Sequence, residues 1–178
     1  MTSHPVTRVR LLPVASRAVR GFTLIELLVV MVIIGIVATI LIGFFVKSYR
    51  KTQLRDGAVQ ILTDLRQARS QAQRVSQGST VALDSTATMA SPNKKYTTVW
   101  GSGSPQTTTN RTLTDPVRVA PYAGGTINSA NSISYSAPYG EVLANGIVWE
   151  VSSTVISDKL YVKAIGVTGK VVLSASPN

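Results

Sequence analysis

The sequence predicts an α+β fold, in which one long N-terminal helix packs on a C-terminal antiparallel β domain. Residues 22–77 contain no proline, and apolar positions recur in them at helical spacing. After Gly78 the composition changes, because Ser, Thr, Gly, Asn and Pro become dense and short β-rich runs begin. The length of 178 residues suits one modest folded domain with additional segments. A long helix followed by a run of strands is the pattern of an α+β domain.

The chain divides into four segments. Residues 1–21 are basic and show no clear period, which predicts a cytoplasmic leader outside the fold. Residues 22–46 are apolar, with Glu26 as their only charge. As a helix, residues 27–46 would extend about 30 Å, enough to cross the hydrocarbon core of a membrane. Residues 47–77 continue as an amphipathic helix, and residues 78–178 form a β-rich head domain.

A single apolar stripe marks the second half of the predicted helix. Its members follow one another at alternating spacings of four and three residues: Leu54, Ala58, Ile61, Leu65, Ala68, Ala72 and Val75. The stripe suits either a coiled coil or packing against a sheet of the same chain. Its alanines are small, and we favour the sheet. Gln77-Gly78 is the predicted C-terminal cap of the helix.

Seven short runs predict the strands of the head domain: residues 80–83, 96–100, 117–120, 133–136, 146–151, 160–167 and 170–174. A two-residue turn at Thr168-Gly169 would join the last two runs as a hairpin. Residues 101–112 and 120–132 are rich in turn-forming residues, and we expect both stretches to be exposed loops.

Composition excludes several kinds of site. The chain has no cysteine, so it forms no disulfide, no cysteine-based zinc site and no catalytic thiol. The single histidine, His4, argues against a histidine metal site and against Ser-His-Asp catalysis. No nucleotide-binding loop is present, and we expect no metal and no cofactor. A membrane-tethered enzyme is the weakest interpretation, because the acids of the head show no pairing in the sequence: Asp84, Asp115, Glu141, Glu150 and Asp158.

The net charge of +10 is unevenly distributed. Residues 1–21 carry four arginines and no acid, and residues 22–77 carry seven basic and three acidic groups. Residues 78–178 carry seven basic and five acidic groups, so the head itself is only slightly basic. A basic chain invites a nucleic-acid interpretation, and this distribution weakens it. Four arginines ahead of the apolar run favour a cytoplasmic N-terminus, whereas the basic group just after it argues for the opposite orientation.

The stretch GFTLIE, residues 21–26, sets the apolar run apart from an ordinary export signal. A secretory signal has a core of about 7 to 15 apolar residues followed by a small-residue cleavage site. Here the core is longer, and the plausible cleavage point, Gly21-Phe22, comes before it. An ordinary signal anchor explains the apolar run and the preceding arginines. It does not explain Glu26, because a carboxylate in lipid costs about 2.5 to 3.5 kcal/mol on insertion scales.

GFTLIE followed by an apolar helix closely resembles the class III signal of type IV pilins and type II secretion pseudopilins. The resemblance covers residues 20 to about 75. It implies that a prepilin peptidase cuts between Gly21 and Phe22 and methylates the new amine of Phe22. It also implies that Glu26 pairs with the N-terminal amine of a neighbouring subunit and sets the register of assembly. The alternative is that Glu26 lies at the membrane interface and reaches water.

Three shorter stretches resemble the minor pseudopilin subgroup called GspH/FimT. They are LTDLRQARSQAQR (residues 62–74), ISYSAPYGEV (residues 133–142) and IGVTGKVVL (residues 165–173). By this resemblance the N-terminal helix packs on two small antiparallel sheets. Two features of many major pilins are missing, a proline near Gly43 and a C-terminal disulfide loop. Both absences favour a minor subunit.

The resemblance implies a structural, non-enzymatic subunit of a type II secretion or type IV pilus filament. Its partners would be other pilin or pseudopilin subunits, the prepilin peptidase, an inner-membrane assembly platform and the lipid bilayer. The chain would cross the inner membrane once, with its N-terminus cytoplasmic and its head extracytoplasmic, and would then enter the filament. The alternative is a minor pilin that binds DNA for uptake, through Lys94, Lys95, Tyr96, Arg111, Arg118, Lys163 and Lys170.

Overall fold

The computed structural model describes residues 21–101, 106–124, 129–142 and 146–177. The chain forms two units, residues 1–41 and 42–178, and each is described by itself. The predicted leader, residues 1–21, lies outside the described residues except for Gly21.

A single helix, α1 (Leu24–Val75), accounts for the whole predicted helical region. In the first unit it supplies the apolar segment up to Leu41, whose side chains are all exposed. In the second unit it provides the amphipathic segment. The absence of proline between residues 22 and 77 permits this continuity, since no backbone donor is lost along the helix.

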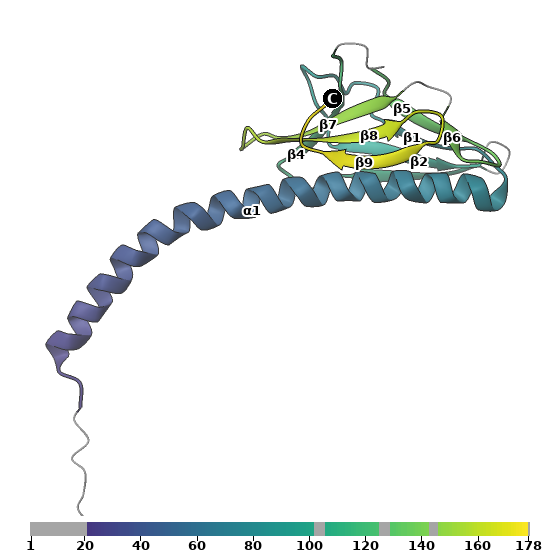
Figure 1. Cartoon of the computed structure of the whole chain (residues 1–178). Coiled ribbons are helices and arrows are strands. Elements are labelled where there is room, and N and C mark those ends of the chain that lie inside the picture. The colour runs from purple at the N-terminus through teal and green to yellow at the C-terminus, as the bar shows by residue number, and fades with distance from the viewer. Residues whose placement is uncertain (1–20, 102–105, 125–128, 143–145, 178) are drawn as a thin grey trace, which may run out of the picture. The chain divides into compact units, whose positions relative to one another are not determined.

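The β-rich part of the second unit consists of two antiparallel sheets, as the sequence predicted (Figure 1). The five-stranded sheet has the order β3-β2-β1-β5-β6 and the four-stranded sheet the order β4-β7-β8-β9. The strands are β1 (Ser79–Leu83), β2 (Lys95–Trp100), β3 (Thr107–Thr112), β4 (Val117–Pro121), β5 (Ser132–Ser136), β6 (Glu141–Val142), β7 (Ile147–Ser153), β8 (Lys159–Ile165) and β9 (Lys170–Ser174).

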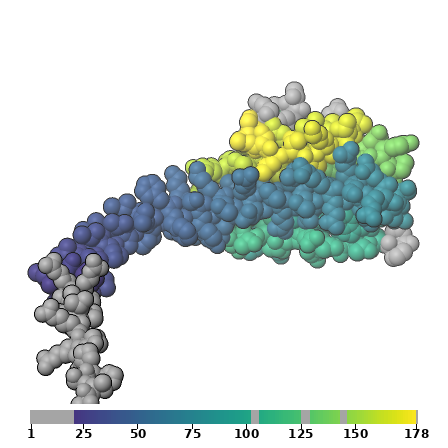
Figure 2. Space-filling view, turned by 60° about the horizontal axis from the view of Figure 1, so that its bottom comes forward, coloured from purple at the N-terminus to yellow at the C-terminus, as the bar shows by residue number. Residues whose placement is uncertain are grey.

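The C-terminal half of α1 lies along both sheets and closes one hydrophobic core with them. Figure 2 shows it between strands of the first sheet and the yellow C-terminal strand of the second. Six of the seven stripe residues are buried, from Leu54 to Ala72, which confirms packing on a sheet of the same chain. The prediction was wrong for Val75, which is the last helical residue and 48% exposed rather than buried with the stripe.

Close approach of helix and sheet depends on Gly57. A Cβ atom at this position would lie 2.8 Å from Cγ1 of Val117, a residue of β4 that is only 1% exposed. The core around this contact contains large side chains from both sheets, among them Trp149, Tyr96 and Tyr135. Gly57 therefore lets the helix backbone approach β4 within ordinary van der Waals contact.

The structure corrects the predicted loop at residues 101–112, because residues 107–112 form β3. The glycines and the proline that indicate a loop precede the strand. The run of threonines that follows has high β propensity, and it pairs with β2 as an edge strand. Its side chains are mostly exposed and none is apolar, so no hydrophobic alternation marks it in the sequence. The short strand β6 was also missed.

Two turn predictions were wrong in detail. Ile165 pairs with Lys170, so the β8–β9 hairpin has a four-residue loop rather than a two-residue turn. The N–H of Gly169 donates to the carbonyl of Gly166 at 3.2 Å, and both glycines take positive φ. The helix ends at Val75, with Ser76 at φ 52 in the left-handed region, so the cap is not Gln77-Gly78. The hydroxyl of Ser79 donates to the carbonyl of Ala68 at 2.6 Å, which holds the chain close to the helix directly after this turn.

Candidate functional site

The N-terminal motif forms the first turn of α1. The backbone N–H of Glu26 donates to Oγ1 of Thr23 at 3.3 Å, and the N–H of Leu27 donates to the carbonyl of Thr23 at 3.2 Å. Thr23 is thus the N-cap, and Glu26 is the third helical residue, the spacing of a capping box. A carboxylate in the first turn also interacts favourably with the helix dipole. This local role of Thr23 was not predicted, although the pattern T-x-x-E indicates it.

The helix that follows has no cover from its own chain. Every residue from Gly21 to Tyr49 is exposed, including Leu24 at 84% and Phe45 at 73%. By length and composition α1 is able to cross a membrane, since its most apolar stretch has a mean hydropathy of 3.1 and none of that stretch is buried. This much exposed apolar surface requires lipid or neighbouring helices as its cover.

A buried polar network joins α1 to the first sheet. The hydroxyl of Tyr96 donates to Oδ2 of Asp64 at 2.7 Å and accepts from Nε2 of Gln60 at 3.0 Å. Asp64 is 6% exposed, and its Oδ2 lies 3.5 Å from Nε of Arg111. Burial, and then the hydrogen bond to Asp64, raise the pKa of Tyr96. Asp64 was not predicted as a buried residue, because a carboxylate beside an apolar stripe looks in the sequence like a solvated one.

Most of the proposed DNA contacts in the first half of the head are ion-paired. Asp115 pairs with Lys94 at 2.8 Å and with Arg118 at 2.6 Å, and these bonds lower the pKa of its carboxyl group, the bond to Lys94 most. Arg111 makes a longer ion pair, with its Nε 3.5 Å from Oδ2 of Asp64. Lys95 lies at the exposed start of β2. These ion pairs reduce the positive charge that the group offers to a phosphate backbone.

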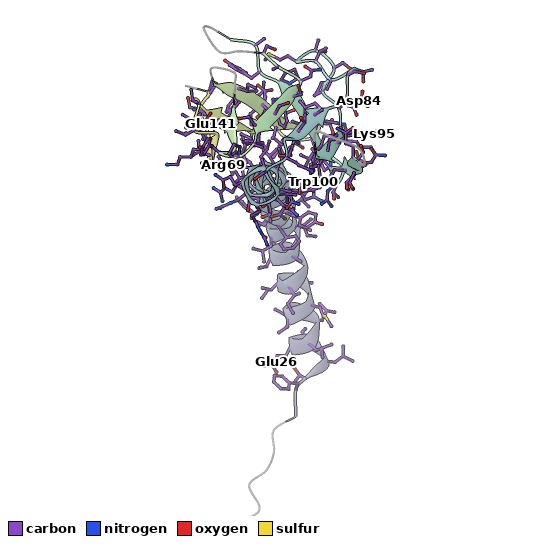
Figure 3. All side chains as sticks on the ribbon, turned by 90° about the vertical axis from the view of Figure 1, so that its right-hand side faces the viewer. Glu26, Arg69, Asp84, Lys95, Trp100 and Glu141 are labelled. Atoms are coloured by element: carbon purple, nitrogen blue, oxygen red, sulfur yellow. The ribbon has the colours of Figure 1, made fainter. Side chains whose placement is uncertain are left out.

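The remaining two candidates, Lys163 and Lys170, lie on β8 and β9 of the other sheet. Lys170 borders a hollow of about 300 Å³ that Arg66 and Arg69 of α1 also line. Figure 3 shows Arg69 on the same side of the head as Glu141, whereas Asp84, Lys95 and Trp100 lie on the other side. The structure therefore separates the predicted contacts into two groups and brings two further arginines to the second.

Three acidic residues of the head have polar partners among the described residues. Asp158 pairs with Lys51, and Glu150 pairs with Lys159. Asp84 accepts hydrogen bonds from the hydroxyl and the N–H of Thr86, which lower the pKa of its carboxyl group. Among the described residues no three metal-ligating side chains lie close enough together to hold a metal ion.

Comparisons with known proteins agree with this geometry. Residues 16–42 match the family described as the prokaryotic N-terminal methylation motif. The type IV minor pilin FimU of Pseudomonas aeruginosa has a similar structure, with a TM-score of 0.53 and 12% identity, over 70% of this chain and 90% of FimU. The minor pseudopilin EpsH from the type 2 secretion system of Vibrio cholerae gives a TM-score of 0.50 and 14% identity, over 71% of this chain and 99% of EpsH. A search of curated proteins found no significant match.

The structural likeness shows a shared fold, and the N-terminal motif adds the signal of an N-methylated, helix-anchored protein. Together they describe a pilin-like fold that follows an N-terminal methylation motif. Residues 16–42 carry the methylation motif, and the chain shares its fold with the minor pilin FimU and the minor pseudopilin EpsH. The motif and the apolar helix suit a membrane anchor.

Proposed function

We propose that the chain is a minor pilin or pseudopilin, of the GspH/FimT type, in a type II secretion or type IV pilus filament. The observation that carries this proposal is the first turn, Gly21 to Glu26, which leads directly into an apolar helix with no cover from its own chain. Lipid covers that helix before assembly, and neighbouring helices cover it afterwards. The head remains extracytoplasmic and the N-terminus cytoplasmic.

In this proposal the four segments act in sequence. The leader, residues 1–21, is removed by the prepilin peptidase, and Phe22 receives the methyl group. Residues 22–46 anchor the subunit and later pack in the filament, residues 47–77 carry the head, and residues 78–178 form its surface. An assembly platform in the inner membrane takes up the processed subunit. The chain itself acts by assembly, as a structural subunit without catalysis.

Glu26 provides the test of assembly. Its carboxylate is exposed in the isolated chain, and we infer that the Phe22 amine of a neighbouring subunit pairs with it in the filament. Glu26→Gln keeps the shape and removes the charge. We expect unchanged membrane insertion and processing, but filament incorporation reduced about tenfold or more, because an uncompensated amine in lipid is costly. Immunoblots of sheared filaments and of membranes measure both quantities.

Thr23→Ala is the matched control for Glu26→Gln. It removes the N-cap hydroxyl from the same turn and costs about 1 kcal/mol of local helix stability, but it leaves the carboxylate in place. Filament incorporation should be nearly normal. Normal incorporation of Glu26→Gln would contradict the pairing role, and an equal loss in both variants would assign the effect to capping.

A second candidate, DNA binding for uptake, is favoured by one observation: the hollow lined by Arg66, Arg69 and Lys170. Arg66 also donates to the carbonyl of Val171 at 3.4 Å, which holds its guanidinium near β9. Three cations at one hollow are suited to backbone phosphates. Non-specific duplex binding typically has a Kd of about 10⁻⁴ to 10⁻⁶ M at physiological salt and weakens steeply as salt rises.

We expect the full chain in detergent to bind duplex no more tightly than this. The measurement is a fluorescence titration at two salt concentrations. The test variant changes Arg66, Arg69 and Lys170 to Gln, and the control changes Lys94, Lys95 and Lys163 to Gln. Sub-micromolar binding that only the test variant loses would make DNA uptake the leading function.

A further inference from the structure

Four cations follow the apolar segment directly, and the assembly function does not use them. Lys47, Arg50, Lys51 and Arg55 lie on the first turns of α1 beyond residue 46. If the head is outside the inner membrane, they oppose the usual bias of positive charge toward the cytoplasmic side. A basic group retained against this bias calls for a binding partner on the outer side.

Three of these cations, Lys47, Arg50 and Lys51, are on the face of α1 that carries the head. The core stripe begins at Leu54 and continues through Ala58 at steps of four and three residues. The same steps taken backward from Leu54 give Lys51 and Arg50, and then Lys47. Side chains three and four residues apart lie on one face of a helix. Lys47, Arg50 and Lys51 therefore continue, toward the apolar segment, the stripe that the head covers.

Their depth matches the headgroup layer of a bilayer. A helix rises 1.5 Å per residue, so the Cα atoms of Lys47 to Lys51 lie within about 8 Å of the end of the apolar segment. The headgroup layer on each side of the hydrocarbon core is about 5 to 7 Å thick. Arg55 starts about 13 Å away, but its long side chain is able to extend back toward the interface.

The head adds an amphipathic hollow next to these cations. It has a volume of about 400 Å³, with Lys51, Arg55 and Lys159 as its cations and Leu54, Leu160 and Ala175 as its apolar lining. Two carboxylates face this region: Asp158 pairs with Lys51 at 3.0 Å, and Glu150 pairs with Lys159 at 2.8 Å.

Positive charge remains after this pairing. Arg50 donates to Oε1 of Gln53 at 3.1 Å, and within the described residues no carboxylate pairs with Lys47, Arg50 or Arg55. The third acid nearby, Asp56, is about half a helical turn away from Lys51 in angle and faces elsewhere. This group of cations is thus net positive and lies next to apolar surface. A phospholipid offers a matching pair of groups, an anionic phosphate and an apolar glycerol and chain region.

We propose that Lys47, Arg50, Lys51 and Arg55, with Lys159, form a basic collar that binds anionic phospholipid headgroups. This inference rests on the proposed membrane anchor. Each cation near an anionic surface adds to the attraction, and on the cytoplasmic side of membrane helices clusters of four to eight cations bind anionic lipids in this way. The collar holds the head at the membrane surface before assembly. Extraction into a filament then exchanges lipid phosphates for other partners.

The test uses the full chain reconstituted into nanodiscs of equimolar phosphatidylcholine and phosphatidylglycerol. Native mass spectrometry of the released protein counts the lipids of each kind that it retains. The test variant changes Lys47, Arg50, Lys51 and Arg55 to Gln. The control changes Lys94, Lys95, Lys163 and Lys170 to Gln, which removes the same charge from other parts of the head. Flotation with pure phosphatidylcholine vesicles, after an alkaline wash, reports insertion of every variant.

We expect wild type and control to retain phosphatidylglycerol over phosphatidylcholine by about twofold or more, with the preference falling as salt rises. The test variant should float normally and retain the two lipids equally. Normal flotation without any preference in the wild type would overturn the collar and leave the anchor intact. Equal loss of preference in test and control would overturn it too, by assigning the effect to overall charge. Failure of the wild type to float would overturn the anchor itself.

Discussion

At the scale of single residues, two buried tyrosines show how hydrogen bonding in the core affects stability. One hydroxyl has hydrogen-bond partners, and the other has none among the described residues. Tyr96 donates to the buried carboxylate of Asp64 and accepts from Gln60, so its hydroxyl is satisfied. The hydroxyl of Tyr135 is equally buried but has no hydrogen-bond partner among the described residues. A satisfied buried hydroxyl stabilises the fold by about 1 kcal/mol, whereas an unsatisfied one costs about 1 to 3 kcal/mol.

We therefore predict opposite effects of one chemical change. Tyr96→Phe should destabilise the head by about 1 to 3 kcal/mol, because it leaves Asp64 without its donor. Tyr135→Phe should be neutral or stabilising by up to about 1 kcal/mol. Thermal unfolding of the full chain in detergent, followed by near-ultraviolet circular dichroism, compares the two. Equal destabilisation by both changes would contradict the assigned hydrogen bonds.

The same residues determine the response to alkaline pH. Burial raises the pKa of both tyrosines, and the hydrogen bond to Asp64 adds to the effect at Tyr96. The unfolded chain loses these protons near pH 10, while the folded head keeps them. The contribution of the two protonated tyrosines to the free energy of unfolding is thus fully present below about pH 10. It is lost as the pH rises further. Either Phe variant should show a weaker loss of unfolding temperature above pH 10 than the wild type, and an unchanged loss would contradict the raised pKa values.

At the scale of elements, the contact between α1 and β4 depends on one missing side chain. Gly57→Ala gains about 1 kcal/mol of helix propensity. It also places a Cβ atom 2.8 Å from Cγ1 of Val117, and overpacking of this kind costs about 1 to 3 kcal/mol. We predict that Gly57→Ala lowers the free energy of unfolding of the wild type by about 1 kcal/mol. In a protein that already carries Val117→Ala, the same change should raise the free energy of unfolding. Unfolding temperatures of the four proteins complete a double-mutant cycle.

Gly43→Ala is the control for this prediction, because a Cβ atom there meets nothing within 4 Å. The unfolding temperature of the head should be unchanged. A coupling near zero between Gly57→Ala and Val117→Ala would mean that the helix does not approach β4 as closely as described.

The elements also show what the sequence reveals and what it hides. The stripe from Leu54 to Ala72 and the hydrophobic strands were predictable, since burial imposes periods that are visible in the residue order. The edge strand β3 was not, because an exposed threonine run carries no alternation. Asp64 and its partners were hidden as well. Its tyrosine and arginine partners come from strands more than thirty residues away, and only the fold brings them together.

At the scale of the whole molecule, two features of one continuous helix account for the proposed function. Its exposed apolar half requires lipid or other subunits, and its amphipathic half is built into the core of the head. The methylation motif at residues 16–42 overlaps the start of this helix, and the proposed pilin role rests on it. Processing at the start of that helix is therefore the central claim.

The intact mass of the protein extracted from membranes, after coexpression with a prepilin peptidase, tests this claim most directly. We predict the mass of residues 22–178 plus one methyl group, and the unprocessed mass of residues 1–178 when the peptidase is absent. A protein that retains Arg20 in the presence of the peptidase, or one cut after Val46, would contradict the account.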